Sequence, residues 1–307
     1  METRMIAVPS RTKEILDRYG LRAKKGFGQN FLVDPVIVSR CAEMSHPEGA
    51  VIEIGPGIGS LTEALAKNAK HVTSYEIDAG LIPVLQDTLA PYENVEIILQ
   101  DFLECDVAEK VRQLKEEYGQ VTVCANLPYY ITTPVLFKIF SLGNDIPYIT
   151  VMVQKEVGDR FAAKPNDPEY GALSVQGQYL YNIRKLFTVP GRSFNPSPKV
   201  DSVIIQFERR KDADLSIDLD DFFELIHALF KQRRKTVYNN LREYLKDADK
   251  AKQVLAQAGI AEGCRAQQLD VKQIRDLYGV LKLKTEHLRK SIFAWMLPEQ
   301  ETTDIMN

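Results

Sequence analysis

Short apolar runs alternate with amphipathic stretches between about residues 34 and 154. The runs rich in β-branched residues predict strands at 50–54, 71–76, 95–99, 121–125 and 147–153. Between them, apolar residues recur at helical spacing over 60–68, 78–89 and 106–118, and Pro134 suits the first turn of a further helix. This alternation is typical of an α/β fold with a parallel sheet covered by helices.

The pattern changes toward the C-terminal end of the chain. Residues 182–189 and 202–208 predict two further strands joined by a proline-rich link, so the sheet is expected to end in an antiparallel pair. From residue 218 onward, Leu, Ile, Phe and Ala recur at helical spacing with almost no Gly or Pro. We therefore expect a sheet domain over 1–212, which begins with a basic segment at 1–33, and a small all-helical domain over 213–307.

Composition limits the classes of protein that fit this pattern. The chain has 307 residues, 45% hydrophobic and 26% charged, as expected for an ordinary globular protein of two domains. No apolar stretch approaches the roughly 18 residues of a membrane span, and the start lacks the apolar core of a signal peptide. We therefore expect a cytoplasmic protein. The cysteines, at 41, 105, 124 and 264, form no C-x-x-C pair and signal neither a zinc site nor a disulfide framework.

Positive charge is concentrated in two places, although the net charge of −3 argues against a uniformly basic nucleic-acid binder. Residues 1–30 hold seven Lys or Arg against three acids. Residues 231–235, "KQRRK", hold four positive charges and no acid. Each cluster is either a phosphate-binding surface or an ordinary solvated face.

A glycine-rich loop, "EIGPGIGSLTEAL", joins the first predicted strand to a helix with Ser60 as its expected N-cap. The glycines are Gly55, Gly57 and Gly59, so the spacing is G-x-G-x-G and differs from the dinucleotide fingerprint G-x-G-x-x-G. A pyrophosphate needs a helix N-terminus as its anion site. S-adenosylmethionine has no phosphate and needs the backbone to pass close to its amino-acid portion. The loop therefore favours S-adenosylmethionine, and Glu53 is part of the same motif in methyltransferases.

Two further acids follow the ends of the second and third predicted strands. Glu76 lies 21 residues after Gly55, where a carboxylate can accept both ribose hydroxyls of an adenosine. Asp101 is placed to accept a hydrogen bond from the adenine amine. Since the carboxyl ends of parallel strands share one edge of the sheet, these acids and the glycines converge on one crevice. The alternative is a doubly wound fold whose turns use Gly, Asp and Glu only as caps.

The fourth predicted strand ends in "NLPYY" at the same edge. The amine of an adenine is a poor nucleophile, because its lone pair is delocalised into the ring. The Asn126 side-chain oxygen and the Leu127 carbonyl, in a turn fixed by Pro128, could accept the two amine hydrogens and direct the lone pair at a methyl donor. Tyr129 could stack on the base. The alternative is a proline turn with an asparagine cap and a core tyrosine.

These motifs resemble the KsgA (RsmA) family of ribosomal RNA adenine dimethyltransferases over nearly the whole chain. The resemblance rests on "KKGFGQNFLVD" (24–34), "EIGPGIGSLT" (53–62), "YEID" (75–78), "NLPYYIT" (126–132) and "FNPSPKVDS" (194–202). It implies a Rossmann-like class I methyltransferase fold that uses S-adenosylmethionine and has a helical C-terminal domain. The implied activity is dimethylation of N6 of two adjacent adenosines in the 3′-terminal hairpin of 16S rRNA, within a small ribosomal subunit or its precursor. We expect a monomer without a metal ion.

The resemblance also assigns roles to individual residues. Those it assigns to S-adenosylmethionine are Asn30, Leu32, Gly55, Glu76, Asp101 and Asn126. It implies that Asn126, the Leu127 carbonyl and Tyr129 hold the target base. It further implies that Phe194 closes the other face of that base.

Two of these segments carry a weaker signal when their residues are considered alone. In "FGQNFL", Gln29 and Asn30 could lie over the cofactor while Phe31 packs, or the segment could be a turn between two helices. In "SFNPSPKVDS", two prolines stiffen a loop that could present Phe194 as a stacking platform or serve only as a linker.

An enzyme that reaches a base inside structured RNA must also bind the sugar–phosphate backbone around that base. The predicted RNA-binding residues are Arg22, Lys24, Lys25, Lys199, Lys231, Arg233, Arg234 and Lys235. Lys231, Arg234 and Lys235 are spaced to share one helix face. The four histidines have no partners at ligand spacing and are interpreted as structural.

Three alternatives to small-subunit dimethylation remain open at this level. One is an Erm-type methyltransferase that acts on 23S rRNA. Enzymes of that type share the glycine loop and the N-L/I-P-Y motif. A second is a ribosome assembly factor whose methyl transfer is secondary or lost. A third is a DNA adenine methyltransferase that flips its target base.

Overall fold

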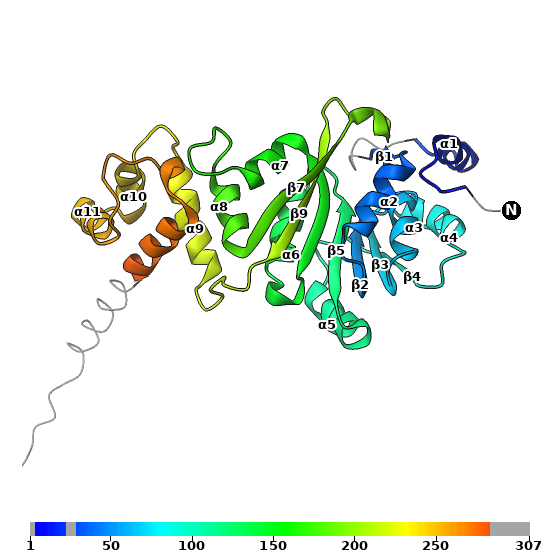
Figure 1. Cartoon of the computed structure of the whole chain (residues 1–307), viewed down its shortest axis with the longest axis horizontal. Helices are drawn as coiled ribbons and strands as arrows, with labels where there is room; N and C mark the ends of the chain where they lie inside the picture. Colours follow the sequence, from blue (N-terminus) through cyan, green and yellow to red (C-terminus); the bar gives the residue numbers. More distant parts are fainter. Residues whose placement is uncertain (1–3, 23–28, 283–307) are drawn as a thin grey trace, which may run out of the picture. The chain divides into compact units, whose positions relative to one another are not determined.

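The computed structural model describes residues 4–22 and 29–282, and within them the chain forms two compact units (Figure 1). The first unit extends to Ala162 and includes Gly177–Ala213. The second unit consists of Ala163–Gln176 and the residues from Asp214 onward. None of the helices in the described ranges is long and apolar enough to cross a membrane.

A seven-stranded sheet forms the centre of the first unit. Its strands are β2 (Ala50–Ile54), β3 (His71–Glu76), β4 (Val95–Leu99), β5 (Val121–Asn126), β6 (Tyr148–Gln154), β7 (Tyr181–Val189) and β9 (Ser202–Arg209). The order is β4-β3-β2-β5-β6-β9-β7, parallel from β4 to β6, with β9 antiparallel to both β6 and β7. The predicted α/β fold and its antiparallel end are confirmed.

The central strands are buried on both faces, which explains their continuous apolar sequences. Every residue of β2 is buried, and so are all residues of β5 except Asn126 at its end. In the parallel register, Ile54 lies opposite Tyr75 and Glu76 opposite Leu99. The carboxyl ends of β2, β3 and β5 therefore lie at one edge, where the site is found.

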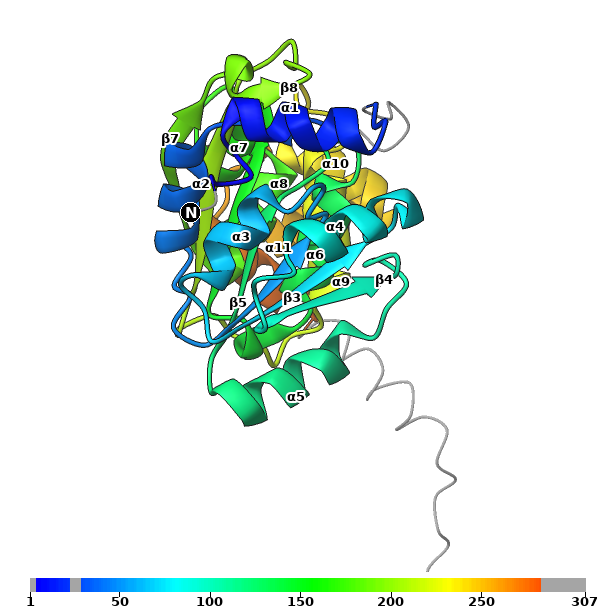
Figure 2. The same cartoon turned by 90° about the vertical axis from the view of Figure 1, so that its right-hand side faces the viewer.

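Helices cover both faces of this sheet. In the first unit they are α1 (Pro9–Arg18), α2 (Pro35–Glu43), α3 (Ser60–Ala66), α4 (Ile82–Thr88), α5 (Val107–Tyr118), α6 (Thr132–Phe140) and α7 (Lys155–Ala162). Single turns of 3-10 helix lie at Ala79–Leu81, Gly143–Asp145 and Gly191–Ser193. Figure 2 shows α3 and α4 on one face of the sheet and α5 on the other. The predicted helix at 78–89 is divided into the turn Ala79–Leu81 and α4.

Several elements were not predicted, and one of them connects two distant motifs. α1, α2, α7 and α8 (Ala172–Leu180) were not among the predicted helices. β1 (Phe31–Leu32) and β8 (Phe194–Asn195) form a separate antiparallel pair in which Leu32 lies opposite Phe194. This pair joins the segments "FGQNFL" and "SFNPSPKVDS".

The second unit is helical, as the periodicity after residue 218 predicts. From Asp214 onward its described elements are α9 (Leu219–Phe230), α10 (Val237–Leu245), α11 (Ala248–Gln257), a 3-10 turn at Ala266–Gln268 and a helix over 271–282. Asp218, Thr236 and Asp247 cap the first three helices by accepting hydrogen bonds from backbone amides of the first turn. The domain boundary at 212/213 stays a prediction.

Candidate functional site

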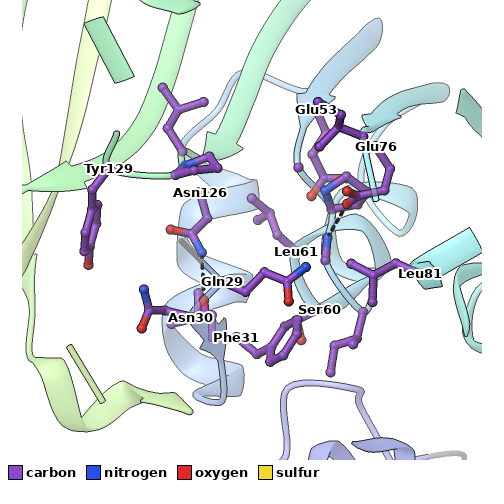
Figure 3. A pocket seen from close by; sticks show the side chains of 18 of the residues that line it. Gln29, Asn30, Phe31, Glu53, Ser60, Leu61, Glu76, Leu81, Asn126 and Tyr129 are labelled. Atoms are coloured by element: carbon purple, nitrogen blue, oxygen red, sulfur yellow. Dashed lines mark hydrogen bonds between the residues drawn. The ribbon is translucent and has the colours of Figure 1, made fainter. Parts of the chain in front are cut away.

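One pocket lies at the carboxyl edge of the sheet (Figure 3). Its lining comes from the segment 29–32, the glycine loop, the end of β3 and the segment after β5. The lining includes Gln29, Asn30, Leu32, Glu53, Gly55, Gly57, Glu76, Asn126, Leu127, Pro128 and Tyr129. The empty space within the pocket is about 810 Å³, a volume that includes the part open to solvent.

The three glycines adopt left-handed backbone conformations, with φ of +70° at Gly55, +63° at Gly57 and +94° at Gly59. A Cβ at Gly57 would lie 3.3 Å from the Phe31 ring, so the loop approaches β1 more closely than a larger residue would permit. Gly59 does not line the pocket. It is the N-cap of α3, the position expected for Ser60, and a Cβ there would lie 3.2 Å from Leu89.

The Ser60 hydroxyl bears on whether the pocket fits a cofactor. Its side chain lines the pocket and is 5% exposed, yet its Oγ has no hydrogen-bond partner among the described residues. A buried hydroxyl without a partner is unusual in a native protein. This hydroxyl and the close backbone approach at Gly57 fit a small polar ligand seated on the glycine loop, as a methyl donor of the S-adenosylmethionine type requires.

Glu53 lies at the base of the pocket and is buried. Its Oε2 accepts hydrogen bonds of 2.7 Å from both the Thr62 and the Ser74 hydroxyls. Burial raises the pKa of Glu53 to about 7, although these two hydrogen bonds act in the opposite direction and Glu76 adds repulsion. Glu53 of β2 is therefore hydrogen-bonded to both α3 and β3.

This raised pKa predicts a pH-dependent stability. The folded state binds a proton at Glu53 that the unfolded chain has released, so the resulting stabilisation is complete below pH ~4.5 and is lost as the pH rises through about 7. The loss amounts to roughly 3 kcal/mol, because each pH unit between these values changes the stability by about 1.4 kcal/mol. Glu53→Gln should abolish this part of the pH dependence in urea unfolding between pH 5 and 8. The exposed Glu48→Gln serves as control; parallel wild-type and Glu53→Gln curves would contradict the assignment.

Glu76 is held by the backbone of its neighbours. Its Oε1 accepts from the Asp78 amide at 2.8 Å and its Oε2 from the Gly57 amide at 3.4 Å. Burial raises the pKa of Glu76, and these amides oppose that effect. Asp78 in turn accepts a 3.0 Å hydrogen bond from the Gln29 side-chain amide. A carboxylate oriented in this way can accept hydrogen bonds from paired hydroxyls.

The segment after β5 is fixed by hydrogen bonds of its own. The Leu127 amide donates to the Met152 carbonyl at 3.2 Å, which extends the pairing of β5 with β6. The Asn126 Nδ2 donates to the Asn30 carbonyl at 3.4 Å, so Oδ1 is the acceptor that the amide presents (Figure 3). Among the described residues, none donates to the Leu127 carbonyl. Tyr129 is held through its hydroxyl, 2.9 Å from the Ser202 Oγ.

Asp101 and Phe194 lie outside the pocket lining, as Gly59 does. The Asp101 carboxylate accepts a hydrogen bond from the Leu103 amide at 2.8 Å. Burial raises the pKa of Tyr130, and the negative charges of Asp101 and Glu76 add to this effect. The Phe194 ring is buried in the core with Leu32 and is 4% exposed. Its predicted role as a stacking surface for the target base stays a prediction.

Several residues of the site were not predicted. Ser60, Ile77 and Tyr130 line the pocket, and Ile77 and Tyr130 are about half exposed at it. Asp78 belongs to the motif "YEID", but no role was predicted for it. Its backbone amide orients Glu76, and its carboxylate holds the Gln29 side chain. The signal for Ser202 was its place in "FNPSPKVDS", but only the fold brings it to Tyr129.

The basic cluster 231–235 differs from its prediction. α9 ends at Phe230 and these residues form a turn, so the shared helix face is wrong. The Glu243 carboxylate pairs with Lys231 at 2.7 Å and with Lys235 at 3.9 Å. Arg233 donates to the Pro168 carbonyl at 2.6 Å. Arg234 is exposed and has no partner in the described part of the chain.

The remaining basic candidates lie elsewhere. Arg22 and Lys199 are exposed in the first unit. Lys24 and Lys25 lie outside the described residues. Within 4–22 and 29–282, no group of three His, Cys, Asp or Glu side chains is arranged to hold a metal ion.

Comparison with known proteins agrees with this geometry. A family model described as Ribosomal RNA adenine dimethylase matches residues 20–283. The Ribosomal RNA small subunit methyltransferase A of Staphylococcus epidermidis is 45% identical over 285 residues, 91% of this chain and 96% of that protein. The protein of the same name from Bacillus mycoides is 46% identical over 286 residues, 91% of this chain and 98% of that one.

Solved structures with a similar fold include a dimethyladenosine transferase and a 23S rRNA methyltransferase. A dimethyladenosine transferase from Plasmodium falciparum has a TM-score of 0.67 and 26% identity, over 80% of this chain and 95% of that one. The 23S rRNA methyltransferase ErmE has a TM-score of 0.62 and 27% identity, over 82% of this chain and all of that one. The resemblance to the KsgA family is confirmed, and the chain is a methyltransferase that belongs to the ribosomal RNA adenine dimethylase family.

Proposed function

We propose that this protein transfers methyl groups from S-adenosylmethionine to N6 of two adjacent adenosines in the 3′-terminal hairpin of 16S rRNA during small-subunit biogenesis. The observation that carries the proposal is the juxtaposition at one pocket of Asn126, the Leu127 carbonyl and Tyr129 with the glycine loop and Glu76. The naming of the relatives as small-subunit methyltransferases supports the choice of substrate.

The cofactor would be held by residues on the β2 and β3 side of the pocket. Gly55, Gly57 and the Ser60 hydroxyl would contact its amino-acid portion, and Glu76 would accept from its ribose hydroxyls. Asp101, which follows the end of β4, would lie toward the adenine amine. The sulfonium of the bound cofactor supplies an electrophilic methyl group.

The chain's own residues would make the adenine amine reactive by positioning it. Asn126 Oδ1 and the Leu127 carbonyl would each accept one amine hydrogen, which draws N6 toward tetrahedral geometry and exposes its lone pair. The Asn30 carbonyl, by holding the Asn126 Nδ2, keeps Oδ1 directed at the base. Tyr129 would hold the ring by stacking. Because both acceptors are fixed before the base arrives, this arrangement needs no strong general base.

The test is transfer of labelled methyl from S-adenosylmethionine to purified small subunits that lack the modification, with products identified by mass spectrometry. N6,N6-dimethyladenosine in the 3′-terminal hairpin is the expected result. Transfer only to naked large-subunit RNA would favour the Erm-type alternative, and transfer preferentially to duplex DNA would favour a DNA methyltransferase. Stable binding to small subunits without methyl transfer would favour a non-catalytic assembly factor.

Arg234 is proposed as a phosphate contact of the second unit, because Lys231 and Lys235 are already paired with Glu243. Arg234→Ala should weaken binding to small subunits and lower the slope of log K against log salt by about 1. Lys231→Ala should change the slope less. Binding measured by filter retention at several salt concentrations checks this, and equal slopes for the two variants would count against Arg234.

A further inference from the structure

The hydroxyls of Tyr129 and Ser202 form a contact between two segments that lie far apart in the sequence. Their oxygens are 2.9 Å apart, and the tyrosine is part-buried at the pocket while the serine is fully buried. Ser202 is the first residue of β9, opposite Gln154 of β6 and Val189 of β7. It is therefore fixed on both sides by neighbouring strands.

The segment just before Ser202 is fixed as well. The Lys155 amide donates to the Asp201 carbonyl at 3.0 Å, and the Gly191 amide donates to the Asp201 carboxylate at 3.1 Å. The Ser202 hydroxyl is thus a rigid anchor. Tyr129, in contrast, follows a proline turn and would otherwise be free to rotate about its side-chain torsions.

Anchoring the far end of the tyrosine restricts the plane of its ring. The hydroxyl is already engaged by Ser202, so the ring faces are the parts of Tyr129 that remain for a base. A stacking surface held in one orientation loses less conformational entropy when the base arrives. Ser202 is in this sense a positioning residue, which acts on the substrate through Tyr129.

The need for such positioning differs between the two methyl transfers to one adenosine. In each transfer a bond forms between N6 and the methyl carbon, the sulfur–carbon bond breaks with its electron pair left on sulfur, and N6 releases one proton to solvent. The unmodified amine has two hydrogens for Asn126 Oδ1 and the Leu127 carbonyl. The monomethylated amine has only one, so one of the two hydrogen bonds is absent in the second transfer.

We propose that the Ser202–Tyr129 hydrogen bond sustains the second methylation, because stacking on a fixed Tyr129 ring must replace the positioning lost with that hydrogen. This inference rests on the proposed function. It predicts that a loosened ring impairs the second transfer more than the first, so that N6-monomethyladenosine accumulates.

The experiment measures both transfer rates for wild type, Ser202→Ala, Tyr129→Phe and the double variant on unmodified small subunits. The rate of the second transfer relative to the first should fall roughly three- to ten-fold in each single variant, the range associated with losing one neutral hydrogen bond. The double variant should equal the single variants, because both remove the same interaction. Ser197→Ala, an exposed serine of the same segment, should behave as wild type.

Two results would overturn the inference: a wild-type ratio in both single variants, or effects that multiply in the double variant. Tyr129→Phe keeps the ring and tests the hydrogen bond even if Ser202→Ala disturbs β9. Failure of the wild-type protein to dimethylate small subunits would instead overturn the proposed function.

Discussion

Asn126→Ala is expected to lower the rate of methyl transfer by about a hundred- to a thousand-fold, the effect typical of removing one preorganised hydrogen-bonding group from an active site. The alanine removes the Oδ1 acceptor that would draw N6 toward tetrahedral geometry. The Leu127 carbonyl remains, since it belongs to the backbone. Single-turnover transfer to unmodified small subunits measures the effect on the chemical step alone.

Two matched variants separate this role from a structural one. Asn126→Asp keeps an acceptor but loses the donor to the Asn30 carbonyl, so an intermediate rate is expected. Asn182→Ala changes an exposed asparagine of β7 and should transfer methyl at the wild-type rate. Binding to small subunits should persist in Asn126→Ala. A rate within a few-fold of wild type would eliminate the proposed role of Oδ1.

Glu76→Ala is expected to weaken binding of S-adenosylmethionine by about a hundred-fold or more, because two hydrogen bonds to a charged acceptor are lost. The substitution also releases the Asp78 and Gly57 amides that hold the carboxylate. Glu76→Gln keeps one carbonyl oxygen, so its affinity should fall between those of wild type and Glu76→Ala. Isothermal titration calorimetry with S-adenosylmethionine measures each Kd.

The control is Glu104→Ala, which changes an exposed glutamate of the loop after β4 and should leave the Kd unchanged. Circular dichroism of Glu76→Ala checks that the fold survives loss of a buried carboxylate. An unaltered Kd in a folded Glu76→Ala protein would place the ribose elsewhere in the pocket.

The strands and the glycine loop were predictable because their signals are local. β2, β3 and β4 have the predicted bounds, because each is a short run rich in β-branched and aromatic residues that stands between helical segments. The short pair β1–β8 was not predictable, because two residues show no periodicity and its partners are more than 160 positions apart. For the same reason the sequence did not show that Phe194 packs beside Leu32, and its role at the target base stays a prediction.

The ion pairs of the basic residues were not predictable from the sequence. The spacing in "KQRRK" predicted that Lys231, Arg234 and Lys235 share one helix face, but the segment forms a turn in which Lys231 and Lys235 pair with Glu243. Which cations are neutralised depends on contacts between elements, and composition carries no information about them.

The sequence by itself determined the α/β fold, the methyl-donor loop and the residues that converge at one sheet edge, because parallel strands place their carboxyl ends together whatever the details of packing. Only the tertiary structure decided that Ser60 carries an unpartnered hydroxyl in the pocket, that Asn30 orients Asn126, and that Ser202 anchors Tyr129. These features depend on distances of about 3 Å between distant segments, and such distances are set by side-chain packing, which no one-dimensional pattern specifies.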